Sequence, residues 1–314
     1  ARRGPAAIAH YDALLRDPAF GAARVPELVL RVGDLPTSKP LRQWLAGLDT
    51  LQIVLDPETA WQDPSGSAAT VLPGDPRTLI DALAEHVTRR TRGRFWLDEW
   101  TAPDRAAAAA IASVLGEDEG LSEPRVAAEL GVRLPAEATL VVASSMPVRD
   151  VETFFPLRSG RPPRVLSNRG ANGIDGTVST AFGVAAAGGP VVLLIGDVAL
   201  LHDLGGLLAA RRLGLPLVIV LLDNDGGGIF HFLPVATQGA AFEEHVATPH
   251  GTDFAHAAAL FGFDHVRVAA PATFRDALDA ALASGRATLI HVRTDREANV
   301  AIHRAVWDAV RAAV

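Results

Sequence analysis

Two stretches of the sequence decide the fold. Residues 191–197 read Val-Val-Leu-Leu-Ile-Gly-Asp, and residues 217–224 read Leu-Val-Ile-Val-Leu-Leu-Asp-Asn. Each is an uninterrupted apolar run that ends in polar residues, which is typical of a strand buried on both faces of a parallel sheet. Residues 202–212 between them fit a crossover helix. We therefore expect a βαβ unit whose two polar ends lie at the same edge of the sheet.

The same alternation continues on both sides of this unit. Further strands are expected at residues 139–143, 164–167, 265–268 and 287–292, and further helices at 106–115, 123–130, 175–187, 254–261, 273–283 and 299–313. This pattern predicts an α/β protein with a doubly wound parallel sheet. Ligands bind such sheets beyond the carboxyl ends of the strands, so the residues that follow each strand are the first candidates for a site.

The first hundred residues predict a smaller unit of the same class. Residues 26–32 and 51–55 are rich in strand-forming residues, and residues 39–48 between them carry apolar side chains at helical spacing. This order indicates a second βαβ unit with parallel strands. Residues 91–103 mix charged residues, two Trp and one Pro. We place a boundary there, between a domain of residues 1–100 and a domain of residues 101–314.

Composition excludes several functional classes. The 314 residues carry a formal net charge of −7, so neither a nucleic acid nor a membrane surface is an expected partner. The sequence has no Cys, which excludes disulfides and thiolate metal sites. Its apolar stretches are far shorter than a membrane span, and its first residues, Ala-Arg-Arg-Gly-Pro, lack an initiator Met and the apolar segment of a signal peptide. We expect a cytoplasmic protein.

Polar residues follow both decisive strands. Gly196-Asp197 follows the first, and Asp223-Asn224-Asp225-Gly226-Gly227-Gly228 follows the second. A carboxylate and an amide oxygen from adjacent strand ends are hard ligands suited to Mg²⁺, which also prefers substrate phosphates. The glycines allow the backbone to approach an anion closely. A helix cap at Asp197 and an ordinary turn would explain each segment separately, but together the segments favour a site for magnesium and a diphosphate.

Other ligand-binding patterns have little support in the sequence. A Rossmann dinucleotide site requires G-x-G-x-x-G after the first strand, and a P-loop requires G-x-x-x-x-G-K-[ST]; neither occurs. The histidines between His202 and His256 fit no metal-binding spacing, and only His250 is a candidate for the edge of a pocket. The magnesium and diphosphate interpretation therefore leads.

The spacing of these residues resembles the cofactor motif of thiamine-diphosphate-dependent enzymes, which runs from Gly-Asp-Gly to a pair of Asn. Asn224 lies 27 residues after Asp197, while Val198 and Asp223 depart from the motif. The surrounding blocks resemble the SEPHCHC synthase family more specifically, from about Val25 to the C-terminus. These blocks are residues 167–176, which include Asn172, and residues 224–230, 242–243, 248–250 and 294–297.

This resemblance implies a fold, a reaction and two cofactors. It implies the thiamine-diphosphate-binding fold, in which part of a smaller central domain precedes the diphosphate-binding domain, with Mg²⁺ and thiamine diphosphate bound. The implied reaction decarboxylates 2-oxoglutarate and adds the succinyl-semialdehyde carbanion to isochorismate in menaquinone biosynthesis. The resemblance also implies a homodimer or homotetramer whose active site lies at a subunit interface.

The resemblance further implies roles for individual residues. Asp197 and Asn224 would bind Mg²⁺ through their side chains and Gly226 through its carbonyl. The other implied positions are Ile174 beneath the cofactor, Ser145, Arg149, Arg169 and Lys39 around the substrate carboxylates, and Ile229, Phe230 and Leu233 in an apolar wall. Arginine suits the substrate role because a guanidinium binds a carboxylate through two parallel hydrogen bonds. Pro40 replaces an Arg of the family, which removes one such contact.

Enzymes of this family have three domains, and we expect this chain to begin within the central one. The pyrimidine-binding domain, whose Glu activates the cofactor, would then be missing, and the chain alone would be an inactive fragment. Two alternatives stay open: a related 2-oxoacid decarboxylase or acetolactate-type synthase, and a non-catalytic diphosphate-binding scaffold. A comparison of pyruvate with 2-oxoglutarate distinguishes the first alternative, and an Asp197→Ala variant distinguishes the second.

Overall fold

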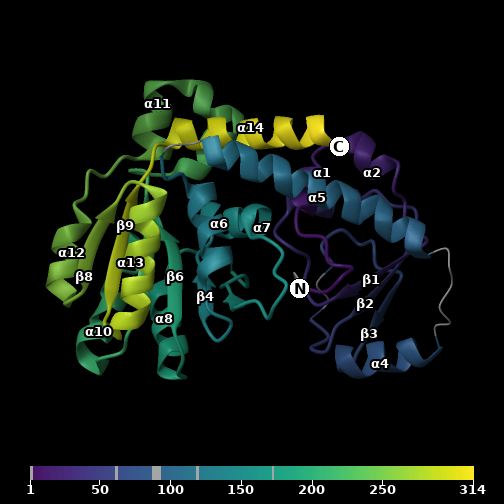
Figure 1. Ribbon diagram of the computed structural model, residues 1–314, viewed down its shortest axis with the longest axis horizontal. Helices are drawn as coiled ribbons and strands as arrows, with labels where there is room; N and C mark the ends of the chain where they lie inside the picture. Colours follow the sequence, from purple (N-terminus) through teal and green to yellow (C-terminus); the bar gives the residue numbers. More distant parts are fainter. Residues whose placement is uncertain (1–2, 61–62, 87–92, 118–119, 172) are drawn as a thin grey trace.

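Two parallel sheets form the framework of the molecule (Figure 1). The computed structural model describes residues 3–60, 63–86, 93–117, 120–171 and 173–314. The larger sheet has the order β5-β4-β6-β7-β9-β8, and the smaller has the order β1-β2-β3. All neighbouring strands in both sheets are parallel. The prediction of a doubly wound α/β fold is confirmed.

The order in which the chain adds strands to the larger sheet reverses between β4 and β6, although all the strands are parallel. Its strands are β4 (Thr139–Val142), β5 (Arg164–Leu166), β6 (Val191–Gly196), β7 (Val218–Asp223), β8 (Asp264–Val268) and β9 (Thr288–Arg293). The chain passes from β4 to β5 on one side and then returns to place β6 on the other side of β4. Such a switch point opens a crevice at the carboxyl ends of the strands, where ligands bind doubly wound sheets.

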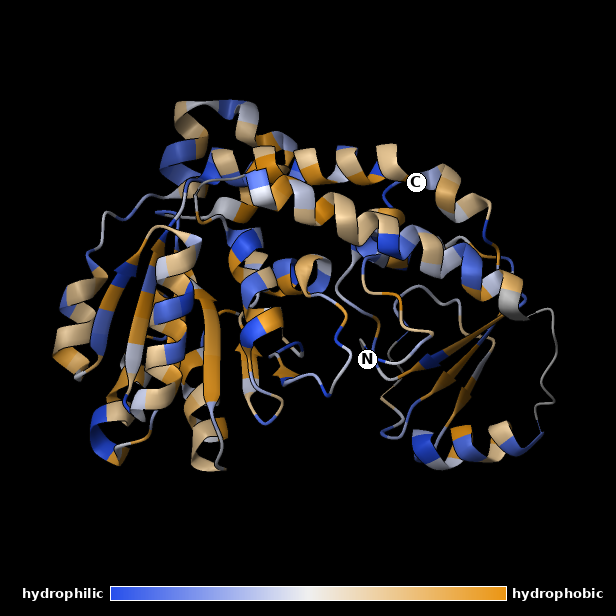
Figure 2. Cartoon of the chain, in the orientation of Figure 1, coloured by the Kyte–Doolittle hydropathy of each residue, from blue (hydrophilic) through white to orange (hydrophobic). Residues whose placement is uncertain are grey.

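Figure 2 shows that hydrophobic residues dominate the strands of the larger sheet, and their side chains form a buried cluster on each face. Along β6, Val192 and Leu194 join one buried cluster, while Leu193 and Ile195 join the other. One face is covered by α6 (Glu123–Arg133), α7 (Met146–Phe154) and α13 (Pro271–Ser284), and the other by α8 (Thr177–Ala186), α9 (Asp197–His202), α10 (Leu208–Leu213) and α12 (Phe254–Phe261). Helix α14 (Arg296–Ala313) follows β9 and runs alongside α5 (Gly93–Glu117). Burial on both faces explains the uninterrupted apolar runs.

The smaller sheet confirms the predicted N-terminal βαβ unit. It consists of β1 (Leu28–Val32), β2 (Leu51–Leu55) and β3 (Thr70–Leu72), with α3 (Lys39–Ala46) between β1 and β2 and α4 (Pro76–His86) after β3. Helix α3 begins where the Ser38 hydroxyl accepts a hydrogen bond from the Leu41 N–H at 3.2 Å. Pro40 fits the first helical turn because its missing N–H is not needed there.

Helix α5 (Gly93–Glu117) covers most of the segment in which the domain boundary is predicted. The described part of this segment is helical and runs through the predicted boundary at residues 100–101; residues 91–92 lie outside the described residues. Pro103 lacks the N–H that would bond to the Glu99 carbonyl, but Arg24 Nε donates to that carbonyl at 3.0 Å instead. The division into two domains itself stays a prediction.

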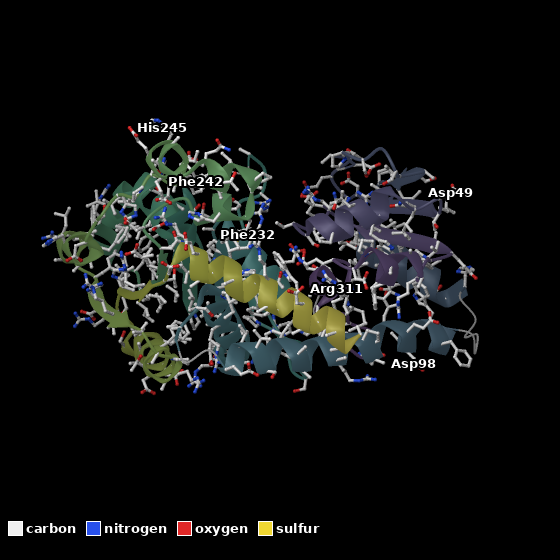
Figure 3. The ribbon with its side chains drawn as sticks, turned by 90° about the horizontal axis from the view of Figure 1, so that it is seen from above. Asp49, Asp98, Phe232, Phe242, His245 and Arg311 are labelled. Carbon is white, nitrogen blue, oxygen red and sulfur yellow. The ribbon has the colours of Figure 1, made fainter. Side chains whose placement is uncertain are left out.

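The N-terminal helices and α14 both pack against α5. Helices α1 (Tyr11–Leu14) and α2 (Pro18–Ala22) were not predicted. Phe20 and Trp44 make edge contacts with Trp100 of α5, at ring-centroid distances of 5.4 and 5.6 Å. Figure 3 shows α14 lying alongside α5.

Among the described helices, none combines the length and apolar character that a membrane span requires.

The predicted single helix at residues 202–212 is wrong. The segment divides into the end of α9, the 3-10 helix η1 (Leu204–Leu207) and α10. Gly205 and Gly206 disfavour a continuous helix, and Asp203 turns its carboxylate to the Ser179 N–H of α8 at 3.0 Å. The remaining short elements are η2 (Gly228–Phe232), η3 (Pro234–Gln238), α11 (Ala240–Phe242) and η4 (Glu243–Ala247).

Candidate functional site

The buried Asp197 carboxylate ties the ends of β6 and β7 together. Asp197 directly follows β6, and its Oδ1 accepts a hydrogen bond from the Val198 N–H at 2.7 Å. Its Oδ2 accepts the N–H groups of Asn224 and Gly226 at 3.1 and 3.0 Å. The prediction that the residues after these two strands lie at the same edge of the sheet is confirmed, because the Asn224 N–H donates to the Asp197 carboxylate. Asp197 therefore does more than cap its own helix, since it also holds the turn after β7.

The turn after β7 requires glycine at Gly226. This residue has a φ of 140°, and a Cβ built on it would lie 2.2 Å from the Ala247 carbonyl oxygen. Asp225 also has a positive φ, of 61°, and its Oδ1 accepts the N–H groups of His250 and Gly251 at 3.0 and 2.8 Å. The turn is therefore held from both Asp197 and the segment around His250.

The Asn224 side chain offers an oxygen for a ligand. Its Nδ2 donates to Glu123 Oε1 at 2.8 Å. Its Oδ1 is buried, and within the described part of the chain it has no hydrogen-bond partner. A buried acceptor without a partner is costly, and a bound cation would relieve that cost. This atom, beside a buried carboxylate, fits the hard oxygen set that Mg²⁺ prefers.

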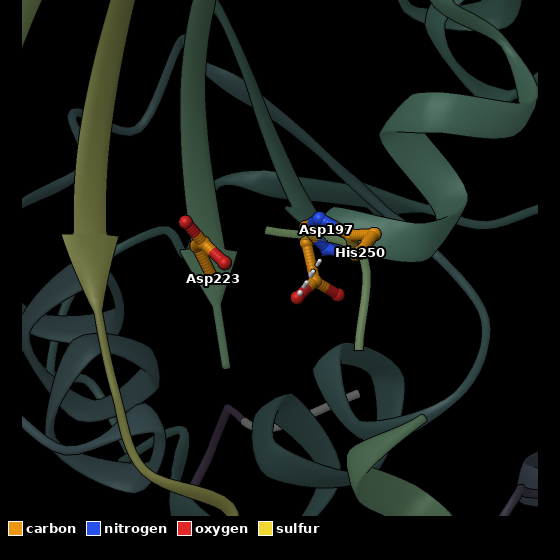
Figure 4. A group of neighbouring side chains, drawn as sticks. All are labelled: Asp197, Asp223 and His250. Carbon is orange, nitrogen blue, oxygen red and sulfur yellow. Dashed lines mark ion pairs between the residues drawn. The ribbon is translucent and has the colours of Figure 1, made fainter. Parts of the chain in front are cut away.

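The two aspartates of the site differ in their surroundings (Figure 4). Burial opposes ionisation of Asp223, but hydrogen bonds from His291 Nε2 at 2.7 Å and Arg293 Nη1 at 2.8 Å hold its pKa at about 2. Burial raises the pKa of Asp197, and the negative charge of Asp223 adds to the effect. Among the described residues, no Arg or Lys forms an ion pair with Asp197 and only His250 approaches its carboxylate, which favours a metal ion at this position.

His250 lies at the same site. Its Nε2 is 3.3 Å from Asp197 Oδ2, and one ligand atom each from Asp197, Asp223 and His250 lies within 4.8 Å of the others (Figure 4). The prediction that His250 lies at the edge of a pocket is consistent with this position. Sequence spacing could not show that His250 also approaches Asp197, because the contact depends on how the loop before α12 returns to the sheet.

A cavity lies between the smaller sheet and the larger one, and its charged lining residues are Arg42, Arg169, Asp34 and Glu152. Its volume is about 710 Å³, and its lining includes Arg42 of α3, residues of α7, and Ser167 and Arg169 after β5. Partial burial and the positive charges of Arg169 and Arg42 lower the pKa of Arg149. The predicted pair Arg149 and Arg169 therefore lies close together. The sequence analysis missed Arg42, which is one helical turn beyond Lys39.

The loop that carries Ser145 is strained. Ser145 has a φ of 73° and a ψ of −133°, a backbone conformation that non-glycine residues rarely adopt. Its carbonyl accepts a hydrogen bond from Arg149 Nη1 at 2.6 Å, and the neighbouring Ser144 hydroxyl accepts one from Arg169 Nη1 at 3.3 Å. Such strain costs about 1–3 kcal/mol and clusters at functional sites.

The remaining predicted residues lie in three places. Ile174 is half-buried before α8, and its side chain packs on a core cluster. Ile229 is half-buried in η2, while Phe230 is 40% exposed and Leu233 is 50% exposed. Lys39 is exposed at the start of α3, and Asn172 lies outside the described residues. The catalytic and binding roles of all these residues stay predictions.

Glu123 is a residue of the site that sequence reasoning missed. It is 1% exposed at the start of α6, and it contacts the turn after β7 through Asn224. Burial and the negative charge of Asp150 raise the pKa of Glu123 to about 7. In the sequence, Glu123 only indicated the first turn of a helix, because 101 residues separate it from Asn224.

Most of the larger sheet lies in a region that matches a known protein family. Residues 149–292 match the thiamine pyrophosphate enzyme family, C-terminal TPP binding domain. This region is therefore similar to a thiamine pyrophosphate enzyme C-terminal domain. Asp197, Asn224 and Gly226 lie within the matched TPP-binding domain, and Glu123 and Lys39 lie before it.

Curated relatives extend the similarity to nearly the whole chain. It is 45% identical over 304 residues to the 2-succinyl-5-enolpyruvyl-6-hydroxy-3-cyclohexene-1-carboxylate synthase of Chloroflexus aurantiacus, covering 96% of this chain and 51% of the relative. It is 42% identical to the synthase of the same name from Geobacillus kaustophilus, with coverage of 96% and 52%. The chain therefore spans about half the length of the curated relatives it matches.

A solved structure has a similar fold. It comes from Mycobacterium smegmatis and is described as a thiamin diphosphate-dependent enzyme. The match has a TM-score of 0.59 and 19% sequence identity, and it covers 86% of this chain and 48% of the other. At this identity the similarity concerns the fold alone, and it agrees with the predicted thiamine-diphosphate-binding fold.

Substitution of Gly226 by Ala tests the geometry of the turn. We expect Gly226→Ala to lower the free energy of unfolding by more than about 2 kcal/mol, because the new Cβ would overlap the Ala247 carbonyl and strain the backbone. Gly205→Ala is the control, since no atom lies within 4 Å of a Cβ there. Urea unfolding measures both variants, and equal stability would contradict the described turn.

Proposed function

We propose that this chain supplies the magnesium- and diphosphate-binding part of a thiamine-diphosphate-dependent carboligase, a 2-succinyl-5-enolpyruvyl-6-hydroxy-3-cyclohexene-1-carboxylate synthase. The observation that carries the proposal is the buried Asn224 Oδ1, which has no hydrogen-bond partner among the described residues. It lies beside the buried Asp197 carboxylate, at the carboxyl ends of adjacent strands. The names of the curated relatives and the match to a TPP binding domain support the same reaction.

Asp197, Asn224 and the Gly226 carbonyl would hold Mg²⁺, which in turn binds the diphosphate. Bound thiamine diphosphate supplies a carbon that can carry the negative charge left when CO₂ departs. Ile174, Ile229 and Leu233 would contact the cofactor, and the exposed ring of Phe230 would exclude water from the reacting centre. These assignments follow the family resemblance position by position.

The cluster of Arg149, Arg169 and Arg42 supports a substrate with more than one carboxylate. Arg149 and Arg169 lie close enough for their charges to interact, and Arg42 adds a third guanidinium from the smaller sheet. 2-Oxoglutarate carries two carboxylates and isochorismate carries further ones, whereas pyruvate carries only one. We therefore place the substrate carboxylates against these arginines, with the Ser145 loop and Lys39 beside them. An acetolactate-type synthase would not need this cluster.

The resemblance supports a cytoplasmic homodimer or homotetramer whose active site lies at a subunit interface. In the family, the Glu that activates the cofactor belongs to the pyrimidine-binding domain. Full activity is therefore a property proposed for the enzyme that carries this sequence together with that domain.

Removal of the Asp197 carboxylate tests the cofactor site. We expect Asp197→Ala to weaken Mg²⁺-dependent binding of thiamine diphosphate more than about 100-fold, because it removes both the charge and the anchor of the turn. Isothermal titration calorimetry measures binding with Mg²⁺ and after chelation with EDTA. Asp276→Ala, on the exposed side of α13, should bind as the parent chain does. Unchanged binding by Asp197→Ala would favour the non-catalytic scaffold.

Removal of the Arg169 guanidinium tests substrate choice. In the enzyme that carries this sequence, we expect Arg169→Ala to raise the KM for 2-oxoglutarate by about 10- to 100-fold, the effect of losing a charged hydrogen-bonded pair. Steady-state kinetics with 2-oxoglutarate and with pyruvate measure the change, and exposed Arg304→Ala on α14 is the control. Efficient turnover of pyruvate by the unsubstituted enzyme would favour the acetolactate-type reaction instead.

A further inference from the structure

Glu123 is a buried carboxylate held by neutral donors. Its Oε1 accepts hydrogen bonds from Asn224 Nδ2 at 2.8 Å and from the Thr294 hydroxyl at 2.9 Å. Its Oε2 accepts a hydrogen bond from Asn299 Nδ2 at 3.1 Å. None of these three partners carries a charge. Burying a carboxyl group in this way costs free energy, so a contribution to stability alone explains it poorly.

The contact between Glu123 and Asn224 determines which atom of the amide faces the site. An amide can present either its oxygen or its nitrogen, and its hydrogen-bond partners decide which. Glu123 Oε1 accepts a hydrogen bond from Asn224 Nδ2, so Asn224 turns its Nδ2 toward Glu123. Its Oδ1 then lies on the other side, buried and without a partner among the described residues. Gly228 leaves room for this arrangement, because a Cβ there would lie 2.6 Å from Asn224 Nδ2.

We propose that Glu123 is a positioning residue that fixes the Asn224 amide so that Oδ1, and not Nδ2, faces the magnesium position. Glu123 does so from α6, while Thr294 after β9 and Asn299 of α14 hold its carboxylate in place. Three segments outside the strand ends of β6 and β7 therefore set the orientation of one proposed ligand. This inference rests on the proposed function and goes beyond it, because the family resemblance assigns no role to Glu123.

Two conservative variants of Glu123 distinguish an effect of where its oxygen atoms lie from an effect of its negative charge. Glu123→Gln keeps an acceptor oxygen at the same distance and loses the charge; its amide nitrogen can donate to Asn299 Oδ1, which is buried and without a partner in the described residues. Glu123→Asp keeps the charge and withdraws the oxygens by one methylene. If Glu123 positions Asn224, Glu123→Gln should keep the affinity for the cation and Glu123→Asp should lose it. If Glu123 only attracts the cation by its charge, Glu123→Asp should keep the affinity and Glu123→Gln should lose it.

The measurement is the dissociation constant of Mn²⁺, a spectroscopic substitute for Mg²⁺, at saturating thiamine diphosphate. We expect Glu123→Gln to bind within about threefold of the parent chain and Glu123→Asp to bind about 10- to 100-fold more weakly, as for groups that orient metal ligands. Glu129→Asp is the matched control, because Glu129 lies on the same helix and pairs with Arg275 instead. It should lower the thermal unfolding midpoint without changing Mn²⁺ affinity.

Each result has a definite meaning. If Glu123→Asp binds Mn²⁺ as tightly as the parent chain, or if Glu123→Gln binds as weakly as Glu123→Asp, the positioning role is wrong. Unfolding midpoints of the metal-free variants show whether a loss of affinity only reflects a loss of fold. If the parent chain itself binds no Mn²⁺ with thiamine diphosphate, the proposed function fails, and the positioning role fails with it.

Discussion

A single carboxylate joins the two strands on which the site is built. Asp197 accepts two backbone N–H groups from the turn after β7, and a third from its own helix. These bonds hold Asn224 and Gly226 in a turn that contains two positive φ angles and that would not form from its own preferences. This carboxylate, together with the contacts of Asp225 to the segment around His250, places the residues proposed to bind the cation next to one another.

The charges around this carboxylate are arranged so that one negative charge remains available. His291 and Arg293 compensate Asp223, which keeps that group ionised and fully engaged. Asp197 has backbone donors and a nearby His250, but no arginine or lysine among its described contacts. Asp197 is therefore a buried carboxylate whose negative charge is only partly balanced by its described contacts. It lies beside the Asn224 amide oxygen, which has no hydrogen-bond partner among the described residues. A divalent cation is the partner that this arrangement suits best.

Sequence reasoning succeeded where the physical cause was local. The strands were predictable because burial on both faces demands Val, Leu and Ile, and the Asp197–Asn224 pairing followed from parallel strand order. It failed where a distant contact decided the outcome. Helix α5 continues through Pro103 because Arg24 takes the carbonyl that proline leaves unpaired. Glu123 could not be linked to the turn, because their contact depends on how α6 packs against the sheet.

Crystals of the protein grown with Mn²⁺ and thiamine diphosphate test the central claim most directly. The anomalous scattering of Mn²⁺ locates the ion independently of any assumption about its ligands. The account predicts one peak within coordination distance of the Asp197 carboxylate, Asn224 Oδ1 and the Gly226 carbonyl, with Asn224 Nδ2 still bonded to Glu123. A peak elsewhere, or an Asn224 amide turned away from the ion, would contradict it.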